Sequence, residues 1–568
     1  MQRWFPILQW LPKYSKNQLL QDLPAGLVVG IMLIPQGMAY AMLAGLHPVY
    51  GLYASIIPLI VYATFGTSRQ LAVGPVAIIS LLVYTGVSPL AEPGTESYFT
   101  LAVLLALMVG VLQIVLGLLK AGVIVKFLSH AVIKGFTAAA AIVIGISQLK
   151  HLIGVPLVSS DNVFVLLYDA LRRLGEIHWL TLSIGIGSMV ALVLVRRTFP
   201  RFPVHIGVVA ASIAIIYLLG LDRQGVKIVG EVPQGFPMPH LPTVSLDAIV
   251  SLIPIAVTIA LIGYLESIAI SKSIASKEKY KIYPNQEFFA LGLSNTIGSL
   301  FSSFPITGSF SRSAVNYQAG ARSGMAAIIT AFCVAIAVLF LTPLLYYLPN
   351  AALAAIVMVA VYGLIDVKGT ISLFRVKVAD GITVLITFIA CLLVGIEIGI
   401  AVGVVFSLAV FIKRSAYPNA VELGYLEKHD VFKSIQRFPK AQTYPNLFIL
   451  RVDAPLYFAN MGLLEDLLER TVRDKPQLEW IIMDFSGVND IDAVAIHDMD
   501  EIMAHYRKEG IGFMLAGVKG QVYGYMVKAG WVDQYGEHIE YLSLQEAVRA
   551  ATLSPQDEKL REEGLVNY

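Results

Sequence analysis

The stretch FPITGSFSRSAVNYQAGARS, residues 304–323, is a polar segment between two strongly apolar ones. It holds five serines or threonines and two arginines. Irregular backbone and charged side chains are tolerated at membrane depth only where protein or a water-lined cavity surrounds them. The stretch therefore predicts a short helix that begins inside a membrane domain and contributes to a binding site.

The composition of the whole chain is that of a polytopic membrane protein. Of its 568 residues, 57% are hydrophobic and only 14% are charged. A membrane-spanning helix needs about 20 apolar residues, and such runs recur between residues 23 and 412. The net charge of +2 is small and the basic residues are dispersed, which argues against nucleic-acid binding. Cys333 and Cys391 both lie in apolar runs, so we expect neither a disulfide, a metal site nor a cofactor.

Fourteen membrane helices are predicted where apolar runs are bounded by charged residues, Pro or Gly. Their ranges are 23–45, 48–65, 74–86, 99–119, 123–148, 178–195, 204–220, 248–272, 287–302, 309–320, 324–346, 350–365, 379–395 and 398–412.

The loop charges orient this bundle. With the N-terminus in the cytoplasm, thirteen basic residues fall in cytoplasmic loops and five fall outside, as the positive-inside rule requires. The thirteen are Arg69, Lys120, Lys126, Arg196, Arg197, Arg201, Lys277, Lys279, Lys281, Arg322, Lys368, Arg375 and Lys377, and the five are Lys150, Arg172, Arg173, Arg223 and Lys227. We expect a multi-pass protein of the cell membrane with both termini in the cytoplasm.

Two segments are short for a span and begin with turn-forming residues, GTSRQLAVGPVAIISLLV (66–83) and ITGSFSRSAVNYQAG (306–320). If the fourteen helices divide seven and seven, these segments are the third helix of each half. Short, Gly/Pro-interrupted segments at matching positions are typical of inverted-repeat transporters with a site near the bilayer midplane. The alternative is that both are packing elements without a ligand.

The first predicted helix contains a break that could line such a site. Within GIMLIPQGMAYAMLAG, Pro35 removes a backbone donor, and Gln36 and Tyr40 share one helix face. These polar groups could line a cavity, or they could form an interhelical hydrogen bond at a packing kink.

The eighth predicted helix carries an acidic residue at membrane depth. Glu266 lies eleven residues before Lys277, which places it about 16 Å from the cytoplasmic basic cluster. A carboxylate there is costly and is suited to take up a proton during transport. The alternative is a structural ion pair, for example with Arg312.

Arg312, with Ser309 and Ser311, stands at the start of the predicted short helix within the opening stretch. Helix N-termini attract anions through free N–H groups and the helix dipole. A second helix that starts near residues 73–75 would aim its N-terminus at the same point. Two such ends plus one guanidinium describe an anion pocket.

From Lys413 onward charged residues become frequent, and the chain reads as a soluble domain. The strand-like runs NLFILRVDAPLYFAN, EWIIMDFSG and IGFMLAG alternate with amphipathic helical runs, which predicts an α/β domain. We divide the chain into a membrane transport domain at 1–415, a linker with the start of the cytoplasmic region at 416–445, an α/β domain at 446–555 and a tail at 556–568.

The chain resembles the sulfate permease (SulP) family, also called solute carrier family 26. The resemblance rests on DLPAGLVVGIMLIPQGMAYAMLAGLHPVYGLYAS (22–55), LAVGPVAIISL (71–81) and the opening stretch, and the C-terminal domain looks like a STAS domain. It implies a seven-plus-seven inverted repeat divided between core and gate domains, elevator-like movement and a homodimer. The substrate positions that it implies are Gln36, Tyr40, Val76, Ser309, Phe310, Ser311 and Arg312, with Glu266 in the eighth helix.

The resemblance leaves the anion open, because family members carry sulfate, bicarbonate, chloride, oxalate or dicarboxylates. Sodium-coupled bicarbonate members are expected to have an aspartate-based cation site in the eighth helix, whereas Glu266 is similar to the proton-coupled sulfate carriers. In related anti-sigma antagonists a phosphorylatable serine follows an aspartate at a helix start. Here Asp492 is followed by Ala493 and Val494, so we expect no phosphoserine switch at this place.

These observations together predict a secondary active transporter that takes up sulfate or a similar inorganic or dicarboxylate anion with protons. Sodium-coupled bicarbonate transport, anion exchange and an uncoupled anion channel remain alternatives, as does a membrane-anchored sensor that signals through the STAS-like domain. That domain could also support dimers or bind a cytoplasmic partner. The sequence shows no Ser/His/Asp, metal-ligand or phosphate-loop constellation, so we do not expect an enzyme.

Overall fold

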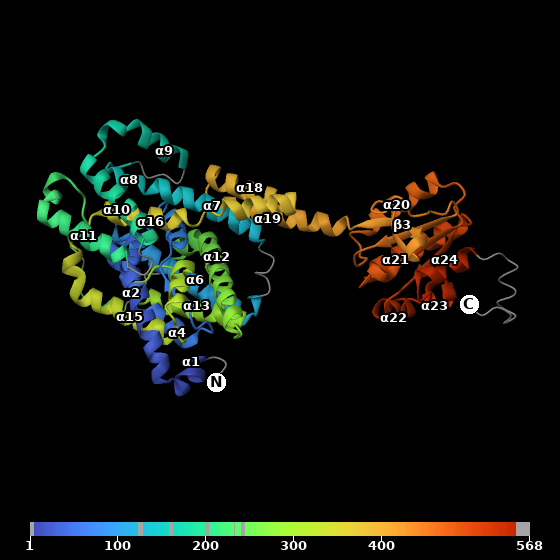
Figure 1. Cartoon of the computed structure of the whole chain (residues 1–568), viewed down its shortest axis with the longest axis horizontal. Helices are drawn as coiled ribbons and strands as arrows, with labels where there is room; N and C mark the ends of the chain where they lie inside the picture. The colour runs from blue at the N-terminus through green and yellow to red at the C-terminus, as the bar shows by residue number, and fades with distance from the viewer. Residues whose placement is uncertain are drawn as a thin grey trace. The chain divides into compact units, whose positions relative to one another are not determined.

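A computed structural model describes residues 5–122, 129–157, 163–198, 204–231, 233, 235–239 and 245–552 (Figure 1). The chain divides into two compact units, Met1–Ser407 and Leu408–Tyr568. Lys126, Arg201 and the predicted tail at 556–568 lie outside the described residues.

The first unit is helical, and its described residues place a helical segment at each of the fourteen predicted spans. These segments are α2 (Lys16–Leu43), α3 (Pro48–Tyr53) with α4 (Ile57–Phe65), α5 (Ala77–Val87), α6 (Glu96–Leu118), α7 (His130–Ser147), α10 (Trp179–Thr198), α11 (Val204–Leu219), α12 (Leu246–Glu278), α13 (Pro284–Ser299), α14 (Phe310–Gln318), α15 (Met325–Ile336), α16 (Asn350–Tyr362), α18 (Val378–Leu393) and α19 (Ile396–Ala416).

Four short helices in the described residues were not predicted, α1 (Ile7–Trp10), α8 (Leu149–Ile153), α9 (Val163–Arg172) and α17 (Val367–Val376). They flank or join the longer ones. Eight described helical stretches are long and apolar enough to cross a membrane by themselves, and four shorter apolar helices accompany them. The first unit is therefore a polytopic helical membrane domain.

Local sequence explains how the long helices begin and how they continue. Ser15 and Gln18 form a capping box at the start of α2, in which each side chain satisfies a backbone N–H of the other residue. The helix stays continuous through Pro24 and Pro35. Pro35 is buried among its neighbours, which is the condition under which proline is tolerated inside a membrane domain, whereas Pro24 is exposed.

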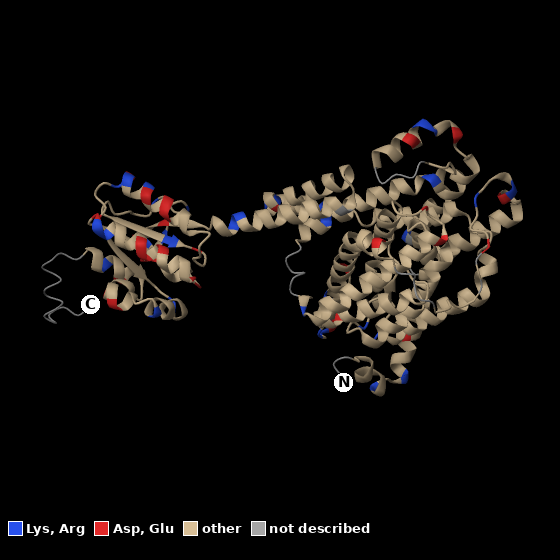
Figure 2. Cartoon of the chain, turned by 180° about the vertical axis from the view of Figure 1, so that it is seen from behind, with Lys and Arg blue, Asp and Glu red and all other residues tan. Residues whose placement is uncertain are grey.

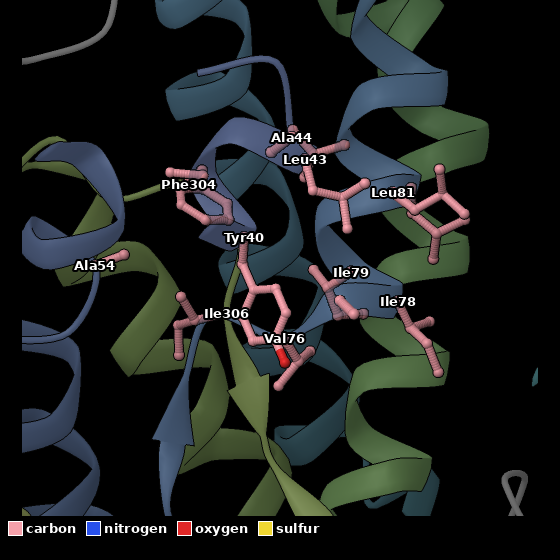
Figure 3. Packing of buried hydrophobic residues seen from close by; sticks show 14 of the residues in the cluster. Tyr40, Leu43, Ala44, Ala54, Val76, Ile78, Ile79, Leu81, Phe304 and Ile306 are labelled. Carbon is pink, nitrogen blue, oxygen red and sulfur yellow. The ribbon is translucent and has the colours of Figure 1, made fainter. Parts of the chain in front are cut away.

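Two very short strands join the halves of the first unit. β1 (Val73–Gly74) pairs antiparallel with β2 (Thr307–Gly308), with Val73 opposite Gly308 and Gly74 opposite Thr307. Segments more than 230 residues apart in the chain therefore share one ladder at the centre of this unit. Buried apolar residues from α2, α5 and the residues before β2 pack around it (Figure 3).

The second unit is an α/β domain, as the sequence predicted. Its sheet has the strand order β4-β3-β5-β6-β7, and the pairs β5–β6 and β6–β7 are parallel. The strands are β3 (Ala420–Leu426), β4 (Val431–Ser434), β5 (Leu447–Val452), β6 (Trp480–Asp484) and β7 (Gly512–Ala516). The helices are α20 (Met461–Asp474), α21 (Ala493–Lys508), α22 (Gly520–Lys528), α23 (Trp531–Tyr535) and α24 (Leu544–Thr552). β3 and β4 lie in residues 416–445, which the sequence predicted as a linker and the start of the cytoplasmic region.

Alternate residues of the strands pack into two apolar layers, one on each face of the sheet. Phe448 and Leu450 belong to the cluster that contains α20 and α21, whereas Leu447 and Ile449 belong to the cluster that contains α24. This period of two is what a strand covered on both faces by helices requires. Figure 2 shows that charged residues are spread along the ribbon of this unit but are sparse along the helices of the first.

Candidate functional site

The β1–β2 ladder brings the beginnings of α5 and α14 together. α5 follows β1 and α14 follows β2, so the antiparallel pairing sends the two helices in opposite directions from one point. The backbone N–H of Ser309 extends the ladder by donating to the carbonyl of Ala72 at 2.9 Å. The N-terminal ends of both short helices therefore meet where the sequence analysis expected an anion pocket.

Arg312 lies in the first turn of α14 and is completely buried, with 0% of its surface exposed. Its Nη2 donates to the carbonyl of Pro75 at 2.7 Å, and its Nη1 donates to Oε1 of Gln36 at 3.4 Å. Its Nε has no hydrogen-bond partner among the described residues. Both partners of the guanidinium are neutral, so its positive charge is not compensated by a direct contact.

Gly74 lets the guanidinium approach the ladder closely. Its φ of +145° is a conformation that side chains disfavour, and Nη2 of Arg312 lies 3.4 Å from where a Cβ at this position would stand. A residue with a side chain would therefore strain the strand.

The remaining residues of α14 that were predicted to contact substrate differ in exposure. Ser309 is buried and caps the helix, since its hydroxyl accepts the N–H of Arg312 at 3.5 Å and lies 3.4 Å from the hydroxyl of Ser311. Ser311 is exposed, and Phe310 is 63% exposed. Phe310 and Ser311 thus project out of the packed interior, while Ser309 and Arg312 belong to it.

The helix α2 contributes Gln36 and Tyr40, one turn apart and both buried. Gln36 contacts Arg312 directly. Tyr40 extends its ring toward Val76, the residue that caps α5 (Figure 3). The structure therefore brings Gln36, Tyr40, Val76, Ser309 and Arg312 around the two helix starts.

Glu266 on α12 lies within electrostatic range of both Arg312 and Tyr40. Its Oε2 is buried and has no hydrogen-bond partner among the described residues. No ion pair joins it to Arg312 within 4.0 Å in the described part of the chain. The structural ion pair between Glu266 and Arg312, which was the alternative interpretation, is therefore not formed in this conformation.

A polar network behind the ladder was not predicted. Asn295 on α13 makes two hydrogen bonds to the backbone of Ile306. Its Nδ2 donates to the carbonyl at 3.1 Å, and its Oδ1 accepts the N–H at 2.8 Å. The same Nδ2 donates to Gln113, whose own amide donates to the carbonyl of Ala260 on α12. This network fixes β2 against α6, α12 and α13.

Ser267 and Thr307 complete this support. The Ser267 hydroxyl lies 2.8 Å from that of Thr307 and accepts the N–H of Gly308 at 2.9 Å. The sequence could have indicated that these polar positions are paired, because polar side chains inside apolar helices are costly unless they have partners. Their partners could not be predicted, since they come from segments distant in the chain.

The arrangement can hold an anion, because two helix N-termini and one buried, uncompensated guanidinium converge on it. A carboxyl group without a partner stands within electrostatic range of the guanidinium. Within the residues that the structure describes, no group of three or more His, Cys, Asp or Glu could hold a metal ion.

Comparison with family models gives two matches. The model of the sulfate permease family matches residues 19–387, and the model of the STAS domain matches residues 438–547. The chain is 38% identical to the probable sulfate transporter 4.2 of Arabidopsis thaliana, over 96% of this chain and 83% of that protein. It is 33% identical to the high affinity sulfate transporter 2 of Stylosanthes hamata, over 97% of this chain and 86% of that protein.

Solved structures agree with this comparison. The murine Solute Carrier 26 family member A9 anion transporter, in an inward-facing state, superposes with a TM-score of 0.89 and 30% identity, over 96% of this chain and 94% of that one. The transmembrane domain of a cyanobacterial bicarbonate transporter shares the fold of 70% of this chain, with a TM-score of 0.61 and 21% identity.

Proposed function

The chain belongs to the sulfate permease family, and on that premise we propose that it takes up sulfate together with protons. The anion is bound between the starts of α5 and α14, and Glu266 on α12 carries the coupled proton. The similarity to several proteins named as sulfate transporters favours sulfate over the other anions of the family.

The observation that carries the proposal is the state of Arg312. A completely buried cation whose partners are a carbonyl and an amide is costly, because its desolvation is not offset by an opposite charge. An anion that binds between the helix starts supplies that charge and accepts the unused Nε–H. Gln36, Tyr40 and Val76 line this space, together with Ser309, Phe310 and Ser311 at the start of α14.

Proton coupling rests on Glu266. Its buried Oε2 has no donor among the described residues, so protonation gives the carboxyl group a neutral form that suits its surroundings. Sulfate carries two negative charges, and a proton taken up by Glu266 reduces the charge that must cross the membrane with it. Arg312 and Glu266 interact electrostatically. Binding of the anion near Arg312 and binding of the proton at Glu266 can therefore influence each other.

The transport cycle follows from the same family premise. The ladder and the helices that hold it move as one body past the remaining helices, in the manner of an elevator, and the transporter works as a homodimer. Both termini lie in the cytoplasm of a cell whose plasma membrane holds the protein, in keeping with the loop charges.

The experiment that tests the proposal is uptake into proteoliposomes that contain the purified chain. Sulfate, bicarbonate, chloride, succinate and fumarate are each supplied under an inward proton gradient, an inward sodium gradient or neither. We expect sulfate to accumulate above its external concentration only under the proton gradient. Accumulation of bicarbonate under the sodium gradient would instead support the alternative coupling, and binding without accumulation would support a sensor.

A further inference from the structure

Two carboxylates outside the anion site are completely buried in the first unit. Glu287 lies on α13 and Asp22 lies on α2, and each has 0% of its surface exposed. Buried carboxylates persist only when they are paired or fully hydrogen bonded. The hydrogen-bond donors of Glu287 and Asp22 therefore indicate what the two carboxylates do.

Glu287 holds the segment that leads into β1. Its Oε1 accepts the N–H of Thr67 at 2.6 Å, the hydroxyl of the same residue at 2.6 Å and the N–H of Ser68 at 3.2 Å. Its Oε2 accepts the hydroxyl of Tyr62 at 2.6 Å. Three of these four bonds go to the loop residues that precede β1 and α5.

Asp22 holds the segment that follows α14 with the same kinds of donor. Its Oδ1 accepts the N–H of Arg322 at 2.6 Å and that of Ser323 at 3.2 Å. Its Oδ2 accepts the hydroxyl of Ser323 at 2.6 Å and that of Tyr14 at 3.0 Å. Burial and the neighbouring carboxylate raise the pKa of the Tyr14 hydroxyl, so it remains a donor.

The two held segments are also tied to each other. The amide of Gln70 donates to the carbonyl of Ala321 at 3.1 Å, and the amide of Asn316 donates to the carbonyl of Gln70 at 3.0 Å. The N–H of Ala72 donates to the hydroxyl of Ser313 at 2.9 Å. Residues 67–72 and α14 therefore form one block, anchored at Glu287 on one side and at Asp22 on the other.

This block determines where the anion-binding groups stand. The carbonyl of Pro75 follows the Glu287 anchor along the chain, and Arg312 precedes the Asp22 anchor. These two groups meet at 2.7 Å in the site. A binding group must be held within about 0.5 Å of its working position, so anchors that fix both segments are needed for affinity.

We propose that Glu287 and Asp22 are positioning residues for the anion site, two buried carboxylate clamps that fix the segment before α5 to α13 and the segment after α14 to α2. This inference rests on the proposed function, because it concerns how the site for sulfate is held. The clamps touch neither the anion nor Arg312 and act only through the segments that they anchor.

The test is equilibrium binding of labelled sulfate to the purified full-length chain at constant pH. We expect Glu287→Ala and Asp22→Ala to weaken sulfate affinity by at least about tenfold, since each loses an acceptor for two backbone N–H groups. Glu287→Gln and Asp22→Asn should stay within about threefold of the original affinity. In both amides the oxygen still accepts the loop N–H groups, while the nitrogen donates to the hydroxyl oxygen of Tyr62 or Tyr14.

A matched control is Asp484→Ala in the second unit, where a buried carboxylate also accepts a loop N–H, that of Ser486 at 2.9 Å. It should leave sulfate affinity unchanged. Alanine variants that remain monodisperse and bind sulfate as tightly as the original chain would overturn the proposal. If neither alanine variant folds, Thr67→Val is the deciding variant. Affinity weakened by about tenfold supports the clamp, because a hydrogen bond to a charged group is lost, and affinity within about threefold of the original refutes it.

A failure of the proposed function is distinguishable from a failure of the clamps. If the unmodified chain binds no sulfate, sulfate is the wrong substrate, and the same variants are compared with whichever anion the chain accumulates. Loss of affinity for that anion in the alanine variants, with recovery in the amide variants, still supports the clamps.

Discussion

At the scale of single residues, Arg312 is the side chain on which anion binding depends. Its guanidinium is buried beside the carbonyl of Pro75 and the amide of Gln36, and neither partner carries charge. Such a group costs stability in the empty site and contributes affinity in the occupied one. The sequence predicted its place at a helix start, but not that its partner would be the carbonyl of Pro75.

Arg312→Met separates these two effects. We expect sulfate binding to weaken by about 30-fold to 1,000-fold, because a buried partner of the anion is lost. The thermal stability of the empty protein should stay equal or rise, because an uncompensated buried charge is replaced by an apolar chain. Thermal unfolding with and without sulfate measures both, and a variant that sulfate still stabilises as strongly as the original chain would contradict the assignment.

Glu266→Gln tests proton coupling at the same scale. In the original chain, uptake should rise as external pH falls, because the protonated carboxyl group accompanies the anion. Glutamine imitates the protonated form permanently, so uptake by the variant should no longer depend on pH or on a proton gradient. Initial rates of sulfate uptake between pH 5 and 8 check this. A variant with an unchanged pH profile excludes Glu266 as the coupling group.

At the scale of elements, the ladder and its supports distinguish what could be predicted from what could not. The places of α5 and α14 followed from two short segments that begin with turn-forming residues, because Gly and Pro mark where a helix begins. The pairing of β1 with β2, the grip of Asn295 on Ile306 and the two carboxylate clamps join distant segments. A single sequence contains no local signal that identifies such partners.

The Asn295 contacts predict a measurable cost of removal. Asn295→Ala leaves the buried N–H and carbonyl of Ile306 without partners, so the free energy of unfolding should fall by about 1–3 kcal/mol. Thermal unfolding of the purified chain measures the loss. Asn419→Ala, which removes an exposed contact with Asp453, is the matched control and should have little effect. Equal stability of the two variants would show that the network does not support β2.

At the scale of the whole molecule, the chain is a membrane transporter of the sulfate permease family that carries a STAS domain, and it is not an enzyme. Composition alone separated the apolar unit from the charged one. It did not reveal β3 and β4, because their short runs AVELGYL and VFKS stand in a segment that is rich in charged residues and bounded by Pro418 and Pro445. β3 joins the sheet by pairing with β5, which lies beyond the expected boundary, and β4 joins it by pairing with β3.

The separation into two units predicts that they unfold separately. Trp531 is buried in the core of the second unit, and Trp531→Ala should destabilise that unit by about 3–5 kcal/mol. Sulfate affinity of the first unit should stay within twofold, since the site lies entirely in Met1–Ser407. Calorimetry measures the stability of the second unit, and equilibrium binding measures the sulfate affinity of the first. A loss of sulfate affinity that accompanies the loss of stability would show that the units depend on each other.

The central claim is that sulfate and protons cross the membrane together at one site. The most direct measurement is the internal pH of proteoliposomes after sulfate is added outside, with no imposed pH gradient and no sodium. We predict that the lumen acidifies as sulfate enters, and that Glu266→Gln liposomes take up sulfate without acidification. Sulfate entry without proton movement in the original chain, or entry that requires sodium, would contradict the claim.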